Sequence, residues 1–168
     1  FNEFKSRIPN LVGIDPANDL ADVKTIIEYF ALDTNNQKKF DVAFCLGSIN
    51  FGEYFNIASQ IASVVMCLKP QARIYWRCNP GRKDHNNSEC EEVPFYDWSF
   101  VEHVRLSKLF NFDIAEMEWD TNNRIYAEWV SKNQWFVDPK KRAMRKFAEG
   151  VHEELEETYG RSYIGTDA

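Results

Sequence analysis

The sequence predicts an α/β fold, a three-layer sandwich with a mostly parallel central sheet that ends in an antiparallel hairpin. Residues 40–47 form an almost continuous apolar run, which is typical of a strand covered on both faces. Over residues 54–68, apolar side chains recur every three or four positions, which predicts a helix with one buried face. The polar turn at residues 120–123 separates two strand-like segments and therefore indicates a hairpin.

The remaining elements complete an alternation of strands and helices, which favours parallel strands joined by crossovers. Lys69 and Pro70 end the helix before the next strand, because proline cannot continue a helix. In chain order we expect a strand at 8–15, a short helix and strand within 19–33, a strand at 72–77, a loop at 82–92, a helix at 98–110 and hairpin strands at 112–119 and 124–130.

Two units are predicted, an α/β domain over residues 1–137 and a C-terminal amphipathic helix with a tail over 138–168. An apolar stripe marks the second unit, and Asp138 can cap its start. Its basic residues crowd the start of the helix and its glutamates the end, which opposes the helix dipole. A docking surface, i,i+4 pairing or simple solvation would each account for this order. The stripe consists of Met144, Phe147, Val151 and Leu155, and the basic residues are Lys140, Lys141, Arg142, Arg145 and Lys146.

Composition narrows the class of protein. The 168 residues are 44% hydrophobic, which suits one domain with a packed core. The net charge of −6 argues against a nucleic-acid backbone as the main partner, since phosphate contacts need clustered Lys and Arg. No apolar run approaches the roughly 20 residues that cross a bilayer. The four cysteines lack zinc-binding spacing, so we expect a reduced, metal-free, cytoplasmic protein.

Three short motifs occur in a recognisable order. Residues 12–15 read VGID, a strand that ends in an acid; residues 40–44 read FDVAF; and residues 65–70 read VMCLKP, the end of a helix. In order and spacing they resemble the second strand, the "FDVV" fourth strand and the "LKPGG" helix exit of class I S-adenosylmethionine-dependent methyltransferases. The resemblance covers about residues 8–131, although Gln71 and Ala72 replace the two glycines.

The resemblance implies which residues would bind S-adenosylmethionine. Asp15 looks like the acid that holds the ribose hydroxyls, and Asp33 like the acid near the adenine edge. Leu46, Gly47 and Ser48 lie where family members line the methyl-donor pocket. From the residues alone, Asp15 and Asp33 also fit turn-forming aspartates, and Ser48 an ordinary helix cap.

Polar residues at strand ends are candidates for contact with a methyl acceptor, because ligands of open α/β sheets bind beyond the carboxyl ends of strands. They are Asn50, Arg77, Asn79 and, in the loop, His85. A structural ion pair is the alternative for Arg77, and a solvated side chain the alternative for His85. His103 and His152 are expected on helix surfaces.

Tyr96 and Trp98 are expected to anchor the helix that follows them rather than to cover a substrate.

The sequence therefore predicts an S-adenosylmethionine-dependent methyltransferase, or part of one, with a small-molecule or unknown methyl acceptor. The alternative is a non-catalytic binding domain of the same fold. The family's glycine-rich opening strand and loop have no counterpart here, and the first residue is Phe1, so we expect an N-terminally incomplete fold. The surface that such a gap exposes would favour a homodimer.

Overall fold

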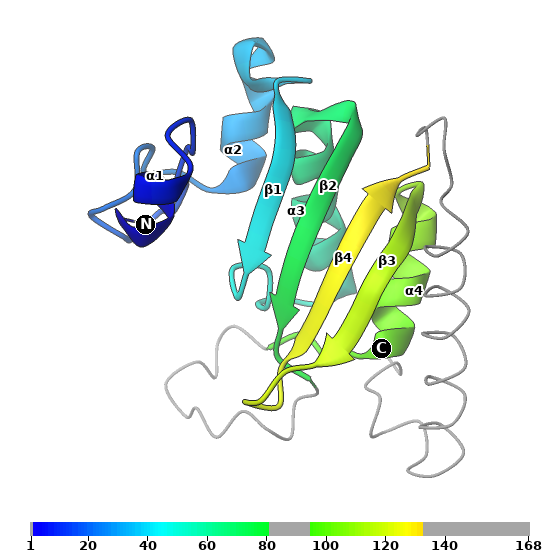
Figure 1. Cartoon of the computed structure of the whole chain (residues 1–168). Helices are drawn as coiled ribbons and strands as arrows, with labels where there is room; N and C mark the ends of the chain where they lie inside the picture. The colour runs from blue at the N-terminus through cyan, green and yellow to red at the C-terminus, as the bar shows by residue number, and fades with distance from the viewer. Residues whose placement is uncertain (1, 81–94, 133–168) are drawn as a thin grey trace, which may run out of the picture.

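The computed structural model describes residues 2–80 and 95–132 (Figure 1). It shows a mixed α/β fold around a four-stranded sheet with the strand order β1-β2-β4-β3. The elements are α1 (Asn2–Arg7), α2 (Ile27–Leu32), the 3-10 helix η1 (Thr34–Asn36), β1 (Phe40–Leu46), α3 (Tyr54–Cys67), β2 (Leu68–Cys78), α4 (Phe100–Leu109), β3 (Phe112–Trp119) and β4 (Ile125–Ser131).

The β1-α3-β2 unit confirms the prediction of a parallel crossover. β1 and β2 pair in parallel, and α3 connects them. Glu53 caps α3, since its side chain accepts from the third helical residue while the Asn56 side chain accepts from the Glu53 amide, a reciprocal capping box. Ile57 and Ile61 on the inner side of α3 are fully buried, as the apolar spacing predicted.

The predicted hairpin is also confirmed. β3 and β4 pair antiparallel around a turn at residues 120–124, and β4 lies between β3 and β2. Because β4 also pairs antiparallel with β2, only one of the three pairings in the described sheet is parallel. The expectation of a mostly parallel sheet is therefore wrong for this part of the chain.

Aromatic rings fill the core beneath β2 and β4. Trp76, Trp98 and Trp129 are fully buried, and the ring centroids of Trp76 and Trp129 lie 4.7 Å apart. His103 of α4 stacks on Trp98 at a centroid distance of 4.5 Å. The expectation that His103 lies on the surface is wrong, because α4 turns a partly polar side toward these rings: Glu102, His103 and Ser107 are buried with Phe100 and Leu106.

In the view of Figure 1, α3 and α4 lie behind the sheet, and α2 lies beside β1 and contacts α3. The described residues thus form two layers, and the expected third layer is not found among them. Burial alternates accordingly along β2, where Ala72, Ile74 and Trp76 are buried and Arg73, Tyr75 and Arg77 are half-buried.

The N-terminal strand expected at residues 8–15 does not join the sheet. Ile14 makes only an isolated bridge to Val23, and the amide of Gly13 donates to Asp22. The segment bonds within its own turn instead: the Asp15 amide donates to the Val23 carbonyl, and the amides of Asp22 and Val23 donate to the Gly13 carbonyl. The predicted loop at 82–92 and the unit at 138–168 lie outside the described residues.

Candidate functional site

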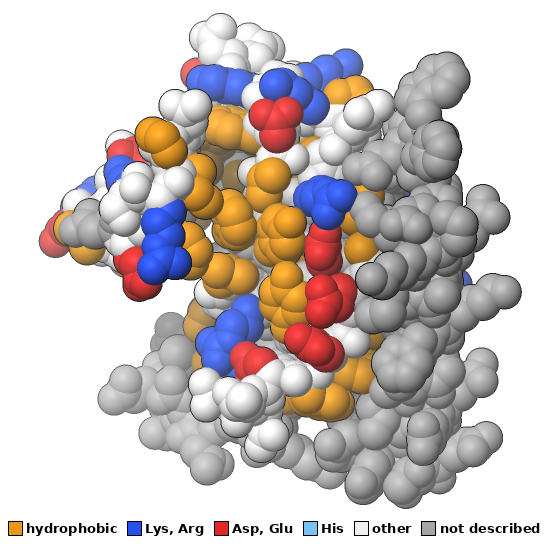
Figure 2. Space-filling model, in the orientation of Figure 1, with side chains coloured by type: hydrophobic (Ala, Val, Ile, Leu, Met, Phe, Trp, Pro, Cys, Tyr) orange, Lys and Arg blue, Asp and Glu red, His pale blue; other side chains and the backbone are white. Residues whose placement is uncertain are grey.

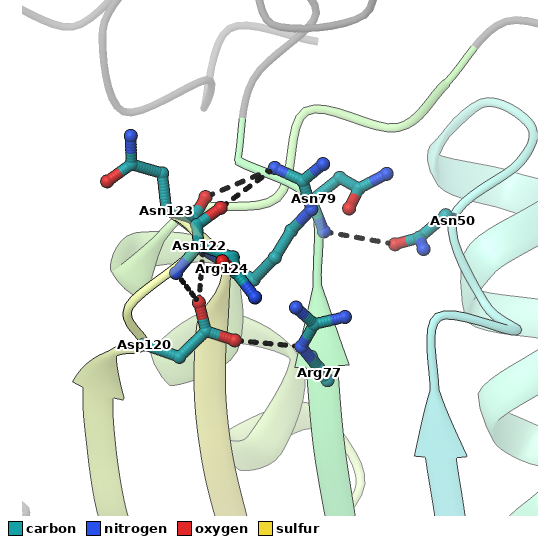
Figure 3. Close-up of polar contacts among 7 residues, drawn as sticks. All are labelled: Asn50, Arg77, Asn79, Asp120, Asn122, Asn123 and Arg124. Carbon is teal, nitrogen blue, oxygen red and sulfur yellow. Dashed lines mark hydrogen bonds and ion pairs between the residues drawn. The ribbon is translucent and has the colours of Figure 1, made fainter.

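One edge of the sheet gathers most of the candidate residues (Figure 3). β1 and β2 end at this edge, since Leu46 near the end of one pairs with Arg77 near the end of the other. The turn between β3 and β4 lies at the same edge, because Cys78 pairs with Ile125 at the start of β4. Parallel strands that end together leave backbone groups free to meet a ligand at this edge. The edge brings together Gly47, Asn50, Arg77, Asn79, Asp120 and Arg124.

A sharp turn follows β1. Gly47 has a φ of +91°, a conformation that other residues adopt only with strain. Its carbonyl accepts a hydrogen bond from Nδ2 of Asn50 at 2.9 Å, and Oδ1 of Asn50 accepts from the Asn79 amide at 3.4 Å. The Asn50 side chain therefore ties the end of β1 to the end of β2. Gly47 and Ser48 themselves remain exposed.

The segment 95–98 fixes this turn from the other side. The Trp98 indole N–H donates to the Ile49 carbonyl at 2.7 Å, and the Tyr96 amide donates to the Asn50 carbonyl at 2.8 Å. The Tyr96 hydroxyl donates to Glu102 of α4, whose other oxygen lies 3.2 Å from Arg105. Trp98 and Tyr96 are buried, so the anchoring role expected for them is confirmed.

Arg77 contacts the opposite side of the site. Its Nε donates to Oδ2 of Asp120 at 2.8 Å, which confirms the ion-pair alternative. Hydrogen bonds from Arg77 and from the amides of Arg124 and Asn122 lower the pKa of Asp120 to about 2. Within the described ranges the pair occupies only Nε of Arg77, so the terminal guanidinium nitrogens can donate to a ligand.

Asp120 and Arg124 are site residues that the sequence analysis missed. Asp120 accepts from the amides of Asn122 and Arg124 at 2.8 and 3.0 Å, which orders the hairpin turn. The Arg124 guanidinium lies 3.4 Å from the carbonyls of Asn122 and Asn123. The polar turn was visible in the sequence, but its contact with Arg77, 43 positions earlier, was not.

The predicted cofactor residues do not all lie together. Leu46, Gly47 and Ser48 are at the edge, and the Leu46 side chain is 41% exposed. Asp33 precedes β1, near the opposite end of that strand, where it accepts from the Asn35 amide and caps η1. Asp15 accepts from the amides of Ala17 and Asn18 at 2.8 and 2.9 Å, within its own turn. These three local hydrogen bonds are those expected if Asp15 and Asp33 only form turns.

The nearby thiols are poor nucleophiles. Burial raises the pKa of Cys45 to about 12 and raises that of Cys78 well above its usual range. His85 lies outside the described residues. The described part of the site therefore offers hydrogen-bond donors, an exposed turn and an ion pair that can orient reactants, and its Asp120 carboxylate is bonded to Arg77.

Two kinds of feature are absent from the described ranges. Within them, no group of three or more His, Cys, Asp or Glu is placed to hold a metal ion. No helix in the same ranges has the length and apolar character needed to span a membrane.

Similarity to known proteins appears at the level of structure. No family model matches the sequence, and no curated protein matches it. The 1,6-didemethyltoxoflavin-N1-methyltransferase of Burkholderia thailandensis, solved with 1,6-didemethyltoxoflavin and S-adenosylhomocysteine, superposes with a TM-score of 0.52 at 10% identity over 66% of this chain. The fold resembles that of this methyltransferase. The match spans 50% of the length of that enzyme.

A second structure has the same likeness. The PH0226 protein of Pyrococcus horikoshii OT3 superposes with a TM-score of 0.54 at 16% identity, over 73% of each chain. At these identities the likeness concerns the fold alone. The resemblance drawn from the sequence motifs is confirmed at that level.

Proposed function

We propose that this chain is an S-adenosylmethionine-dependent methyltransferase, or part of one, with its cofactor at the Gly47 turn. The observation that carries the proposal is this exposed turn, at the carboxyl end of the parallel β1–β2 pair in a methyltransferase fold. In open α/β sheets this is the edge where ligands bind.

Residues at the turn fit such a cofactor. Gly47 has no Cβ, so a ligand can approach the backbone closely, and the bond from Asn50 holds the turn in place. Leu46 offers exposed apolar surface and Ser48 an exposed hydroxyl. When bound, S-adenosylmethionine supplies an electrophilic methyl group, so the protein has mainly to align the acceptor with it.

We assign the acceptor side to Asn50, Arg77 and Asn79. Asp120 orients the Arg77 guanidinium, whose terminal nitrogens can donate to an acceptor oxygen or ring nitrogen. The Asn50 side chain is already bonded on both sides, so its role is to position the turn. His85 stays a prediction from the sequence.

The alternative is a non-catalytic binding domain of the same fold. The local bonds of Asp15 and Asp33 favour it, because carboxylates that order their own turns are less free to hold a ribose. Cofactor binding separates the two proposals.

The test is calorimetric titration of the chain with S-adenosylhomocysteine. Wild type should bind, and Ser48→Trp should abolish binding because an indole at this exposed position fills the approach to the turn. Leu109→Trp is the control, since Leu109 is also exposed but lies at the end of α4, and it should bind like wild type. No binding by folded wild type would reject the donor site and leave the non-catalytic alternative.

Two further variants test whether Asp15 and Asp33 bind the cofactor or only order their turns. If Asp15 holds the ribose, Asp15→Ala should lose S-adenosylhomocysteine while its circular dichroism spectrum stays unchanged. If Asp15 and Asp33 only order turns, Asp15→Ala and Asp33→Ala should both bind like wild type, with lower melting temperatures.

A further inference from the structure

One face of the sheet is reached, among the described helices, only by Phe4 of α1 at its β1 side. The strands β1 to β4 present it toward the viewer in Figure 1, and Figure 2 shows its side chains. The strand register places Phe44, Tyr75, Glu128 and Glu116 in one row across this face. We call this surface the open face.

The β1 side of the open face is apolar. Val42, Phe44 and Leu46 are 37%, 37% and 41% exposed, and they alternate with residues that point to the core. Phe44 stacks on Tyr75 at a centroid distance of 5.4 Å, and Phe4 of α1 approaches Phe44 at 6.0 Å. A contiguous apolar surface of this kind indicates a packing partner.

The β3 side is acidic. Glu116 lies opposite Glu128, an arrangement of like charges that destabilises a strand pair, and Glu118 follows on the same face. Arg73 pairs with Glu128, whereas no cation in the described ranges pairs with Glu116 or Glu118. Partial burial and these neighbouring carboxylates raise the pKa of Glu116. An added positive charge would stabilise this column.

We propose that the C-terminal segment, residues 138–160, packs across the open face of its own chain. Its sequence combines the apolar stripe from Met144 to Leu155 with the basic run from Lys140 to Lys146. The stripe matches the apolar side of the face, and the basic run matches its acidic column. This proposal does not depend on the proposed enzymatic function.

The length of the segment fits the sheet. β4 ends at Ser131, and residues 132–137 can extend about 20 Å, enough to turn from the strand onto the face. A helix over residues 139–159 would be about 31 Å long, and the seven residues of β4 extend about 23 Å. One helix can therefore cross the whole sheet.

The path of the chain explains the order of charges in the segment. A segment that packs on this face after β4 would run back toward the turn at Asp120. The basic half then passes the glutamate column first, and the glutamates at 153–157 come last, toward the edge that holds Arg77 and Arg124. Attraction from the sheet would thus offset the unfavourable alignment with the helix dipole.

Zero-length carbodiimide cross-linking of the full chain tests the proposal, since it joins carboxylates to lysine amines only when they touch. We expect intramolecular links from Glu116 or Glu118 to Lys140, Lys141 or Lys146, mapped by mass spectrometry in the monomer band. The exposed pair Lys69–Asp41, with Nζ and Oδ1 3.2 Å apart, is the internal positive control.

Two results would overturn the proposal. Links from these glutamates that appear only in the dimer band would assign the open face to a second copy. A Lys69–Asp41 link without any link to the segment would show that the segment lies elsewhere.

A variant pair separates docking from random charge encounter. Met144→Asp with Phe147→Asp keeps every lysine, and we expect it to reduce the glutamate–lysine links severalfold by removing the apolar contact. Leu32→Asp with Leu109→Asp changes two exposed leucines of α2 and α4, and should leave the links unchanged. Equal link yields in both double variants would contradict apolar docking.

Discussion

Acidification should destabilise this fold through His103. The ring is fully buried, and its Nδ1 accepts a hydrogen bond from the Trp129 indole at 3.2 Å, so Nδ1 must stay unprotonated. Burial among aromatic rings lowers the pKa of His103 from 6.5 to about 3. The unfolded chain therefore binds a proton at this residue well before the folded chain does.

The sign and size follow from that difference. The contribution of His103 to stability is complete above pH 6.5 and is lost as the pH falls toward the folded pKa of about 3. Each pH unit in this window costs about 1.4 kcal/mol, so a fall of two units should remove roughly 3 kcal/mol from the free energy of unfolding.

Urea unfolding monitored by tryptophan fluorescence measures the effect, since Trp76, Trp98 and Trp129 surround the ring. His103→Gln is the comparison variant, because glutamine can accept from Trp129 but does not titrate. Between about pH 7.5 and about pH 4.5, wild type should lose roughly 3 kcal/mol more than the variant. Carboxylates titrate in both proteins, so their contributions to the loss of stability cancel in the comparison. Equal losses, or a native His103 that titrates near 6.5 by NMR, would refute the reasoning.

Three further predictions concern the scaffold. In urea titrations, Ile61→Ala should lower the free energy of unfolding by about 2–5 kcal/mol, because Ile61 is fully buried. Phe55 lies in the same helix but is 79% exposed, so Phe55→Ala should change that free energy by less than about 0.5 kcal/mol. Ser99→Ala should cost about 1 kcal/mol, since its hydroxyl accepts the Glu102 amide and caps α4; a melting temperature equal to wild type would contradict this role. Gly47→Ala should lower the free energy of unfolding by about 1 kcal/mol or more, because alanine is strained at a φ of +91°. The strain would come from the backbone alone, since the nearest atom to an added Cβ lies 3.9 Å away. An unchanged urea midpoint would refute that account.

Local patterns predicted the elements well where one period dominates. α3 begins at Tyr54 as expected, because its apolar residues follow the helical period without interruption. The hairpin was predicted to within a residue at each strand, since the polar turn at 120–123 leaves little choice of register. These elements are specified by residues close in sequence.

Features that depend on distant partners were not predictable. α4 buries Glu102 and His103 because Tyr96 and Trp129 donate hydrogen bonds to them. The spacing of apolar residues in the sequence does not indicate these hydrogen bonds. The VGID segment has the composition of a strand, yet Asp22 holds it in a local turn. At the candidate site, the gathering of Asn50, Arg77 and Asn79 was anticipated from strand ends. The bond from Arg77 to Asp120 required knowing that β4 inserts beside β2.

The outer edge of β1 has a consequence for how this chain behaves at high concentration. In the described ranges no strand pairs with that edge, and its sequence FDVAFCL is rich in β-formers, with one charge and neither proline nor glycine. Such an edge is a template for strand addition between molecules. Purified samples should therefore aggregate in a concentration-dependent way, and a lysine at Val42, whose side chain is 37% exposed, should act as a gatekeeper that keeps them dispersed.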